Sequence, residues 1–396
     1  MRAATQTSVG VGIGLSLSES LEAALLEATR DDREVAGVLL CSASEPLRPG
    51  VRLVGVAIRM VPESAYLRRE ADALTIASDG YVAALGEAET LGLIPIWFHT
   101  HPRQGSSPRH SSHDEIVDAQ LAPVFRIRSG CTAYGSLVLS PGAEHIRFTG
   151  FLDDGQSRLL LDRITVTGDQ LTVIPQEPGP HGASDEERAV GGEVFSRNIR
   201  AFGGPVQAAV ASLAVGVVGC GGTGSVIAEQ LVRLGVRNLR LIDPDNLDAS
   251  NVTRVYGSTA ADVGKPKAAV LANHLTGIAP DLMVASLVGT VNDESVARSL
   301  TDRDVVFGCT DDNAGRIVLS RLAAYLRIIV IDSGVLLSST TDGQLRGIDA
   351  RVTVLKPGSA CLICRGRIDL SLAAAEQMSA EEHGRLAAEG YAPALA

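Results

Sequence analysis

The segment Val217-Val-Gly219-Cys-Gly221-Gly222-Thr-Gly224 decides the fold of the C-terminal half of this chain. It follows an apolar strand and opens a helix. Its glycines let the backbone approach a phosphate, whose charge is met by N–H groups at the helix start. Asp243 ends the next apolar run, where a carboxylate can bind ribose hydroxyls. These two features suit NAD enzymes as well as ATP enzymes, so an NAD-dependent oxidoreductase remains an alternative.

Outward from this turn, apolar runs and helical segments alternate through the C-terminal half. Such alternation is typical of an α/β, Rossmann-like fold with a mostly parallel sheet covered by helices on both faces. The expected strands are Val215–Gly219, Leu239–Asp243, Met283–Val288, Asp304–Cys309 and Ile328–Asp332, and the expected helices start near Gly222, Gly264, Asp293 and Asn313.

Charged residues downstream of the turn add features that NAD chemistry does not need. Lys265 and Lys267 form a cation pair suited to phosphates, and Asp311 stands at the end of another expected strand. ATP chemistry needs such a carboxylate because Mg²⁺ must neutralise the polyphosphate. An ATP and Mg²⁺ site is therefore favoured, although the neighbouring Asp312 leaves open which aspartate binds the metal.

From about Phe195 to Asp369, these motifs together resemble the ThiF/MoeB family, the adenylating core of ubiquitin-activating enzymes. The resemblance implies that the C-terminal Gly carboxylate of a ubiquitin-like or sulfur-carrier protein attacks the α-phosphate of ATP. The products are an acyl adenylate and pyrophosphate. Arg197 is similar to a family arginine that reaches into a partner subunit's ATP site, which implies a homodimer. The implied binding residues are Gly219, Gly221, Gly222 and Gly224 for phosphates, Asp243 for ribose, Asn251, Arg254 and Lys267 for the triphosphate, and Asp311 for Mg²⁺.

The pair in Cys361-Leu-Ile-Cys364 matches the first half of the structural zinc site in the same family. Two cysteines cannot close a tetrahedral zinc site, and no second pair precedes Ala396. We therefore expect an adenylation domain over residues 195–396 that is truncated at its C-terminus. A second, structural Zn²⁺ is expected only if the missing pair exists. No cysteine follows Cys364, which favours adenylation without a thioester.

A second constellation lies in the N-terminal half, where Trp97-Phe-His99-Thr-His101-Pro102 ends an apolar run. Alternate residues of a strand share a face, so both imidazoles point the same way. Asp114 follows thirteen residues after His101 and lies one helical turn from Ser111. Two His and one Asp leave one tetrahedral position open for water, which is the arrangement of a catalytic zinc. Upstream, Glu34 places a carboxylate beside an otherwise apolar strand.

Over roughly residues 10–155, this pattern resembles the JAMM/MPN+ metalloprotease family, whose motif is an upstream Glu, then His-x-His-Pro, then Ser-x-x-Asp. The resemblance implies an α+β JAMM/MPN domain, assigned here to residues 1–160. It implies zinc bound by His99, His101 and Asp114, with Glu34 as general base and acid and Ser111 supporting the oxyanion. The irregular order of expected strands and helices agrees with an α+β fold. His110 and His113 are interpreted as loop residues.

Composition fits two globular domains joined by a linker over residues 161–194, where Pro and Gly are frequent. The 396 residues are 45% hydrophobic and carry a net charge of −11, which argues against broad nucleic-acid binding. The glycine turn interrupts the apolar stretch Gln207–Val232, so no membrane span is expected. The six cysteines are scattered, which favours a reducing cytoplasm over a disulfide framework.

The chain is therefore interpreted as bifunctional: zinc-dependent cleavage after the C-terminal Gly of a ubiquitin-like protein, for processing or deconjugation, and Mg-ATP-dependent adenylation of the same carboxylate. Such fusions resemble bacterial ubiquitin-like conjugation or sulfur-transfer systems, which makes a conjugating enzyme a further candidate partner. The alternatives are sulfur-carrier activation for cofactor or amino-acid synthesis, the NAD-dependent oxidoreductase, and a non-catalytic scaffold.

Overall fold

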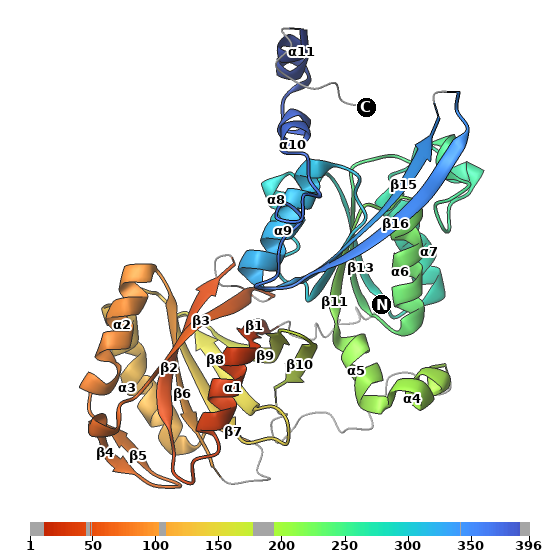
Figure 1. The fold of residues 1–396 in the computed structure, drawn as a ribbon. Coiled ribbons are helices and arrows are strands. Elements are labelled where there is room, and N and C mark those ends of the chain that lie inside the picture. The colour runs from red at the N-terminus through yellow and green to blue at the C-terminus, as the bar shows by residue number, and fades with distance from the viewer. Residues whose placement is uncertain are drawn as a thin grey trace, which may run out of the picture. The chain divides into compact units, whose positions relative to one another are not determined.

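The computed structural model describes residues 12–44, 48, 50–102, 108–176, 194–340 and 342–388. The chain divides into two compact units, Met1–Gly182 and Ala183–Ala396 (Figure 1). This division falls inside the linker predicted from the sequence, so each unit carries one of the two predicted constellations.

The first unit has the α+β organisation expected from the sequence. Eight of its described strands form one mixed sheet in the order β1-β3-β2-β6-β7-β8-β9-β10, and β1 also pairs with β9, so the sheet closes on itself. The elements are β1 (Ile13–Ser18), α1 (Glu19–Ala28), β2 (Ala36–Ala43), β3 (Arg52–Met60), the 3-10 turn η1 (Glu63–Ala65), β4 (Tyr66–Arg69), β5 (Leu74–Ile76), α2 (Asp79–Leu91), β6 (Ile94–Thr100), α3 (Ser112–Ser129), β7 (Tyr134–Ser140), β8 (Arg147–Asp153), β9 (Arg158–Thr167) and β10 (Leu171–Pro175).

The two faces of this sheet bury two separate apolar clusters, one against α1 and one against α2 and α3. Along β6, Ile96 and Phe98 join the cluster on the α1 side, whereas Trp97 packs with α2 and α3. Because side chains alternate along a strand, His99 lies on the same face as Trp97, at the end of β6. The alternation of side chains along β6 therefore places His99, the first predicted metal ligand, on the face covered by α3.

The first unit extends beyond the sequence-based boundary at residue 160. Within the predicted linker 161–194, the end of β9 and all of β10 belong to the sheet, where β9 pairs with β1 and β10 pairs with β9. The physical reason is apolar burial, since Leu161, Ile164 and Val166 pack in the core. The linker residues 177–193 lie outside the described residues.

The second unit contains a six-stranded sheet in the order β13-β12-β11-β14-β15-β16, in which only β16 runs antiparallel to its neighbour. This confirms the α/β, Rossmann-like prediction. The elements are α4 (Ser196–Phe202), α5 (Gly204–Ser212), β11 (Ala214–Val218), α6 (Gly222–Leu234), β12 (Asn238–Asp243), η2 (Ala249–Asn251), η3 (Ala260–Asp262), α7 (Lys267–Ile278), β13 (Met283–Val288), α8 (Glu294–Arg298), β14 (Val305–Gly308), α9 (Asn313–Leu326), β15 (Ile329–Ser339), β16 (Leu345–Leu355), α10 (Leu370–Glu376) and α11 (Ala380–Ala388).

Helices α6 and α7 cover one face of this sheet, and α8 and α9 cover the other (Figure 1). The strand order reverses between β11 and β14, and ligands of such sheets bind beyond the carboxyl ends of the strands at this point. The glycine turn follows β11 and Asp311 follows β14, so both lie at this edge. In the part of the chain that the structure describes, no helix is both long and apolar enough to cross a membrane.

Candidate functional site

His99, His101 and Asp114 come together in the first unit, as their spacing predicts. His99 Nε2 lies 3.2 Å from His101 Nε2 and 3.2 Å from Asp114 Oδ1, and His101 Nε2 lies 3.8 Å from Asp114 Oδ2. Zinc–ligand bonds of about 2.0 Å in a tetrahedron place ligand atoms about 3.3 Å apart. The three side chains therefore fit one Zn²⁺ ion. No other trio of His, Cys, Asp or Glu within the described residues is arranged in this way.

Asp114 is held in place by the start of α3. Ser111 is the N-cap residue, and its Oγ accepts the backbone N–H of Asp114 at 3.2 Å, while Asp114 Oδ2 accepts the backbone N–H of Ser111 at 2.6 Å. This reciprocal capping box fixes both residues. Burial alone would raise the pKa of Asp114, but its hydrogen bond to His99, the charge of His99 and the capping bonds hold that pKa well below its ordinary value. Asp114 is thus an anion suited to a metal.

Glu34 lies just before β2, and its carboxylate approaches the same cluster. Its Oε1 is 4.0 Å from His101 Nε2, and its side chain is 9% exposed. Burial raises the pKa of Glu34 to about 7, against the charge of His99 and with the support of the charges of Asp114 and Asp72. A carboxyl group with this pKa can both accept and release a proton near neutral pH. The structure thus brings together all five residues predicted for the metal centre's chemistry, since Ser111 is joined to Asp114 by the capping box.

His110 belongs to a buried polar network that the sequence analysis missed. Its Nε2 lies 3.1 Å from Ser136 Oγ on β7, and nearby Tyr134 donates its hydroxyl to Asp118 Oδ1 at 2.5 Å. His110 does lie in a loop, but His113, also expected there, lies in the first turn of α3. The sequence offers one hint of this network: Asp118 follows Asp114 by one turn of the same helix, so the two carboxylates lie on the same side of α3.

In the second unit, the backbone of the glycine turn is so closely packed that two of its positions have no room for a side chain. Gly219 has a φ of 90°, which lies in the left-handed region. A Cβ on Gly224 would lie 1.8 Å from the carbonyl oxygen of Gly219. A Cβ on Gly221 would meet nothing within 4 Å. The turn therefore needs glycine at two positions for its own shape and leaves open space beside Gly221, at the N-terminus of α6.

Asp243 braces this turn from the end of β12. Its Oδ2 accepts the backbone N–H of Cys220 at 2.6 Å, and its Oδ1 accepts that of Asp245 at 2.9 Å. Burial raises the pKa of Asp243, although these two hydrogen bonds and the charge of Lys267 oppose the shift. Each carboxylate oxygen has a second lone pair, so Asp243 can hold the turn and still accept a ribose hydroxyl.

The three residues predicted to contact the triphosphate already have partners. Lys267 Nζ donates to Asp245 Oδ2 at 2.8 Å, and Arg254 Nη1 donates to a backbone carbonyl at 3.0 Å. Asn251 Oδ1 accepts a backbone N–H three residues earlier at 3.1 Å. A Cβ on Gly222 would lie 3.2 Å from Arg254 Cδ, so Arg254 lies against the first residue of α6. Arg254 therefore lies beside the helix end that would meet a phosphate.

The adjacent aspartates after β14 play different parts. Asp312 is the N-cap of α9, and it also accepts hydrogen bonds from Asn292 and Thr310. Asp311 is exposed and makes no hydrogen bond or ion pair with the described residues. Asp311 thus has both oxygens available for a metal ion, whereas Asp312 is committed to the fold. The geometry favours Asp311 as the Mg²⁺ ligand.

Three of the predicted residues have roles that depend on groups outside the described residues. Arg197 is exposed on α4, and its predicted role involves a second subunit, so that role stays a prediction. Cys361 Sγ and Cys364 Sγ lie 3.5 Å apart. Two thiolates on one tetrahedral zinc would lie about 3.8 Å apart, so the pair fits half of such a site. No third ligand joins it from the residues that the structure describes.

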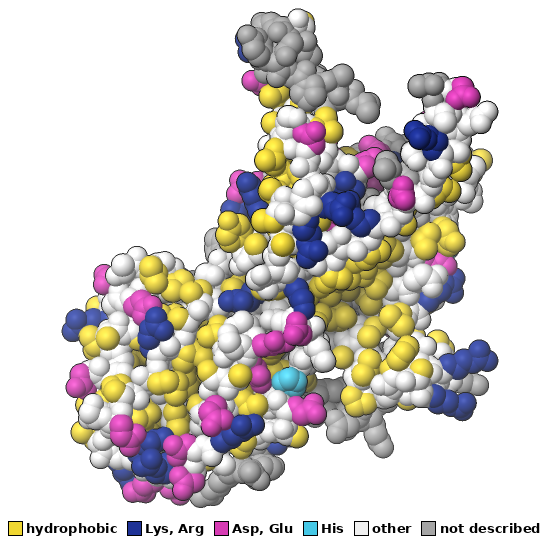
Figure 2. All heavy atoms as spheres, viewed as in Figure 1, with side chains coloured by type: hydrophobic (Ala, Val, Ile, Leu, Met, Phe, Trp, Pro, Cys, Tyr) yellow, Lys and Arg dark blue, Asp and Glu magenta, His cyan; other side chains and the backbone are white. Residues whose placement is uncertain are grey.

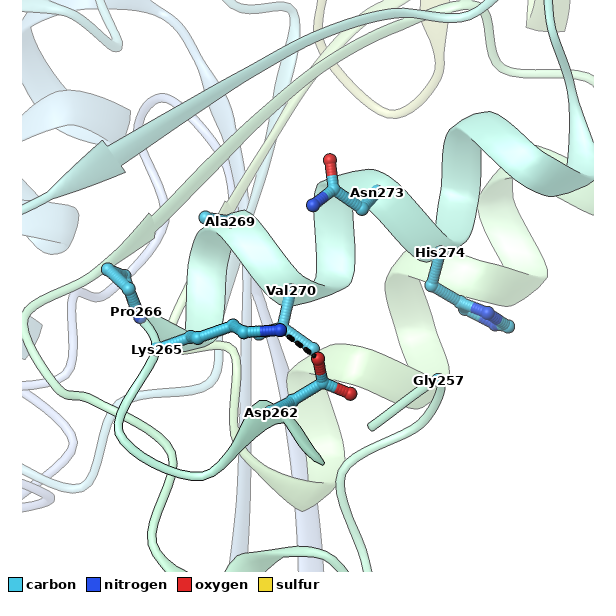
Figure 3. Close-up of a pocket in the computed structure, with 8 residues that line it drawn as sticks. All are labelled: Gly257, Asp262, Lys265, Pro266, Ala269, Val270, Asn273 and His274. Carbon is cyan, nitrogen blue, oxygen red and sulfur yellow. Dashed lines mark hydrogen bonds and ion pairs between the residues drawn. The ribbon is translucent and has the colours of Figure 1, made fainter. Parts of the chain in front are cut away.

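A pocket of about 400 Å³ opens elsewhere on the second unit, beside α7 (Figure 3). Lys265 points across it to Asp262, with Nζ 2.8 Å from Oδ1. None of the glycines of the turn lines the pocket, and neither does Asp243, Lys267 or Asp311. The predicted cation pair is therefore divided, since Lys267 faces Asp245 while Lys265 lines this separate pocket.

One face of the β15–β16 hairpin is apolar and uncovered, a feature that the sequence analysis did not foresee. Figure 2 shows hydrophobic side chains grouped around this part of the second unit. Val335, Ile348, Val352 and Val354 are 56%, 63%, 68% and 49% exposed. Ile331 pairs with Val354, and Phe307 on β14 pairs with Ile331, so these residues continue the face that α6 and α7 cover elsewhere.

A mostly parallel sheet whose strand order reverses beside a glycine turn, with a buried aspartate at the end of the next strand, defines a nucleotide-binding α/β domain. Its particular family follows from a direct match, because residues 195–390 fit the model of the ThiF family. This part of the chain is therefore a ThiF/MoeB-type domain. The match does not extend into the first unit.

Curated relatives agree with this assignment. The ATP-dependent ubiquitin transferase-like protein Cap2 of Enterobacter hormaechei is 40% identical over 28% of this chain and 18% of its own length. The molybdopterin-synthase adenylyltransferase of Escherichia coli is 28% identical over 43% of this chain and 65% of its own. The sulfur carrier protein ThiS adenylyltransferase of Escherichia coli is 34% identical over 25% of this chain and 40% of its own. The chain thus spans less than two thirds of each relative's length.

Proposed function

We propose that this chain is a bifunctional enzyme that acts on the C-terminus of a ubiquitin-like protein. The second unit adenylates the carboxylate of the C-terminal glycine with ATP and Mg²⁺. The first unit is a zinc peptidase of the JAMM/MPN+ kind that cleaves the bond following that glycine. The ThiF-family match over residues 195–390 carries the first of these activities. The convergence of His99, His101 and Asp114 beside Glu34 carries the second.

For adenylation, the described residues supply positioning and charge. A carboxylate oxygen of the glycine attacks the α-phosphorus of ATP, the bond from that phosphorus to the bridging oxygen breaks, and pyrophosphate leaves. Backbone N–H groups at the start of α6 face the phosphates. Arg254 and Lys267 offset the charge of the triphosphate, and Asp311 would hold the Mg²⁺ ion. Lys267 must exchange its present partner, Asp245, for a phosphate.

For cleavage, a bound Zn²⁺ ion would lower the pKa of a water molecule and polarise the scissile carbonyl. Glu34 accepts the proton that the attacking water loses and delivers it to the leaving amine nitrogen. Ser111 Oγ accepts the backbone N–H of Asp114, which leaves the serine's own hydroxyl hydrogen to donate to the developing oxyanion. The raised pKa of Glu34, about 7, suits a group that must act as base and then as acid.

The class of partner is supported by the relatives and by the apolar hairpin face. One relative is named for a ubiquitin transferase-like activity and another for a sulfur-carrier protein. Val335, Ile348, Val352 and Val354 expose apolar side chains on one face of this hairpin, and grouped apolar side chains of this kind are typical of surfaces that bind proteins. The homodimer in which Arg197 completes a neighbour's ATP site remains part of this proposal.

A sulfur-carrier substrate is the second candidate, because one relative adenylates such a protein. The chemistry of the ATP site is the same for both, so the substrate decides between them. An NAD-dependent function is less well supported, because the free carboxylate of Asp311 has no task in dinucleotide binding.

The test is to incubate the purified chain with ATP, Mg²⁺ and a panel of ubiquitin-like and sulfur-carrier proteins that carry short C-terminal extensions. Intact-mass spectrometry should record loss of the extension and then a gain of one AMP, and pyrophosphate exchange into ATP should depend on the same protein. A zinc chelator should stop trimming but leave exchange with already trimmed protein. If no protein of either class supports exchange, the adenylation proposal is wrong.

A further inference from the structure

We infer that Arg69 is a positioning residue for Glu34, which holds the main chain that carries the base of the metal centre. This inference rests on the proposed peptidase function. Arg69 ends β4, and it is separated from Glu34 by 35 positions in the sequence. It touches none of the metal ligands in the contacts that the structure records, so its action on the site passes through Glu34.

Glu34 needs support because strand pairing does not reach it. The ladder between β2 and β6 begins with Ala36 opposite His99, and the ladder between β2 and β3 begins with Gly37. Glu34 therefore lies two residues outside the sheet. A general base must keep its carboxylate within hydrogen-bonding reach of the reacting proton, and an error of 1 Å can lower a rate by roughly a hundredfold.

Two contacts from the end of β4 supply this support. Arg69 Nε donates to the carbonyl oxygen of Glu34 at 3.0 Å. The backbone N–H of Glu34 donates to the carbonyl oxygen of Glu70 at 2.8 Å. Both polar groups of the Glu34 main chain are therefore bonded to adjacent residues of one segment, which restricts rotation of the peptide units on either side of the base.

Arg69 is itself anchored on two further sides. Its Nη1 donates to Glu63 Oε2 at 2.8 Å and its Nη2 donates to Asp31 Oδ2 at 2.6 Å. Its side chain is only 11% exposed and lies over the ring of Tyr66, with 4.9 Å from Cζ to the ring centre. The planar guanidinium fits three acceptors in fixed directions, which a lysine cannot do.

The residues after Glu34 are tied to the strand that carries the histidines. The backbone N–H of Val35 donates to Thr100 Oγ1 at 2.8 Å, and the backbone N–H of Thr100 donates to the carbonyl of Val35 at 2.8 Å. The backbone N–H of Ala36 donates to the Tyr66 hydroxyl at 3.0 Å. Side chains of β4 and β6 thus hold residues 34–36 from two directions, and Arg69 provides the link at the base itself.

The first test uses the metal-free protein and no substrate. Amide hydrogen exchange of the segment that contains Glu34 and Val35 should quicken at least tenfold in Arg69→Ala. The matched control is Arg68→Ala, because Arg68 is adjacent, is 57% exposed and pairs with the side-chain carboxylate of Glu70. Exchange in Arg68→Ala should equal that of the wild type. Equal exchange in Arg69→Ala and the wild type would overturn the inference.

The second test follows hydrolysis of a peptide that ends in Gly-Gly joined through an amide to aminomethylcoumarin. Arg69→Ala should bind the same amount of zinc as the wild type, lower kcat by roughly 10–100-fold and change KM less than threefold. A purely structural role predicts a lower melting temperature with an unchanged kcat per folded, zinc-loaded molecule, and this result would also overturn the inference.

If Arg69→Ala does not fold, Arg69→Lys and Glu63→Ala replace it. Both keep most of the packing and remove one or two hydrogen bonds of the clamp, so both should show smaller losses of kcat in the same direction. Unchanged kcat in both would contradict the inference. If the wild type binds zinc and cleaves nothing, the peptidase proposal fails, while the exchange comparison still decides whether Arg69 holds Glu34.

Discussion

Asp312 accepts the backbone N–H of Gly315 at 2.7 Å and thereby caps α9. This one contact separates the roles of two carboxylates that the sequence leaves indistinguishable. The oxygens of Asp312 accept hydrogen bonds that stabilise the fold, whereas the exposed Asp311 beside it has its oxygens available to a cation.

Substitution of the two aspartates should therefore affect different properties, with Asp311 needed for activity and Asp312 for stability. Asp311→Asn should lower ATP–pyrophosphate exchange more than a hundredfold and leave the free energy of unfolding within about 0.5 kcal/mol of the wild type. Asp312→Ala should lower the free energy of unfolding by about 1 kcal/mol, because it removes the N-cap. Exchange assays and urea unfolding measure the two quantities. Full exchange in Asp311→Asn would move the metal ligand elsewhere.

Glu34→Gln should stop peptide cleavage without releasing zinc. Glutamine fills the same space but cannot accept a proton, and loss of a general base lowers rates by roughly 10²–10⁴-fold. His99, His101 and Asp114 remain to bind the metal. Metal content by mass spectrometry and hydrolysis of the coumarin amide check both halves of the prediction. A variant that loses its zinc would show Glu34 to be a ligand instead.

The same substitution should change how the stability of the metal-free protein depends on pH. The pKa of Glu34 is raised from 4.5 to about 7 in the folded state. Between these values the folded chain keeps a proton that the unfolded chain has lost, so the free energy of unfolding falls as pH rises through this window. Glu34→Gln cannot ionise at this position, so it lacks this fall in the free energy of unfolding. It should be more stable than the wild type at pH 8, by on the order of 2 kcal/mol, and equal to it at pH 4.

Urea unfolding of the metal-free proteins at the two pH values measures this difference. Glu89→Gln provides the control, because Glu89 is exposed on α2. It should show no gain at either pH. A gain in Glu34→Gln that is the same at pH 4 and pH 8 would indicate a packing effect rather than the buried carboxylate.

Two glycines of the turn allow folding to be separated from nucleotide binding. Gly224→Ala places a methyl group 1.8 Å from a backbone oxygen, so it should lower the free energy of unfolding by more than about 2 kcal/mol. Gly221→Ala meets no neighbour and has an allowed φ of −73°, so it should fold normally. Its methyl group would occupy the space where a phosphate approaches. Titration with a fluorescent ATP analogue should show at least tenfold weaker binding, and unchanged affinity would place the phosphates elsewhere.

The sequence predicts the second unit best where periodicity is local. The strand Met283–Val288 has the bounds expected, and α6 and α9 start at the expected residues. In contrast, β16 was missed because its pairing with β15 depends on a hairpin rather than on a strand–helix repeat. The end of the first unit was misplaced for a similar reason, since β9 finds its partner β1 about 150 residues away.

The same distinction applies to the metal centre. Fixed spacing along one strand and one helix start predicts His99, His101 and Asp114, and the structure brings them together. Nothing in the sequence singles out Arg69, Tyr66 or Tyr134, because none of them belongs to a motif with a fixed spacing to the metal ligands. Their contribution depends on contacts between segments that only folding brings together, such as β4 with the residues before β2.

The strand β1 lies between β3 and β9 and is parallel to both. This strand closes the sheet into a ring. Without residues 13–18, the edges of both β3 and β9 would lose their hydrogen-bonding partner. Bare edges of this kind pair readily with other molecules. A shortened form that begins after Ser18 should therefore self-associate into aggregates, and any protease cut before α1 that releases β1 would inactivate the first unit even though no residue of its metal centre is removed.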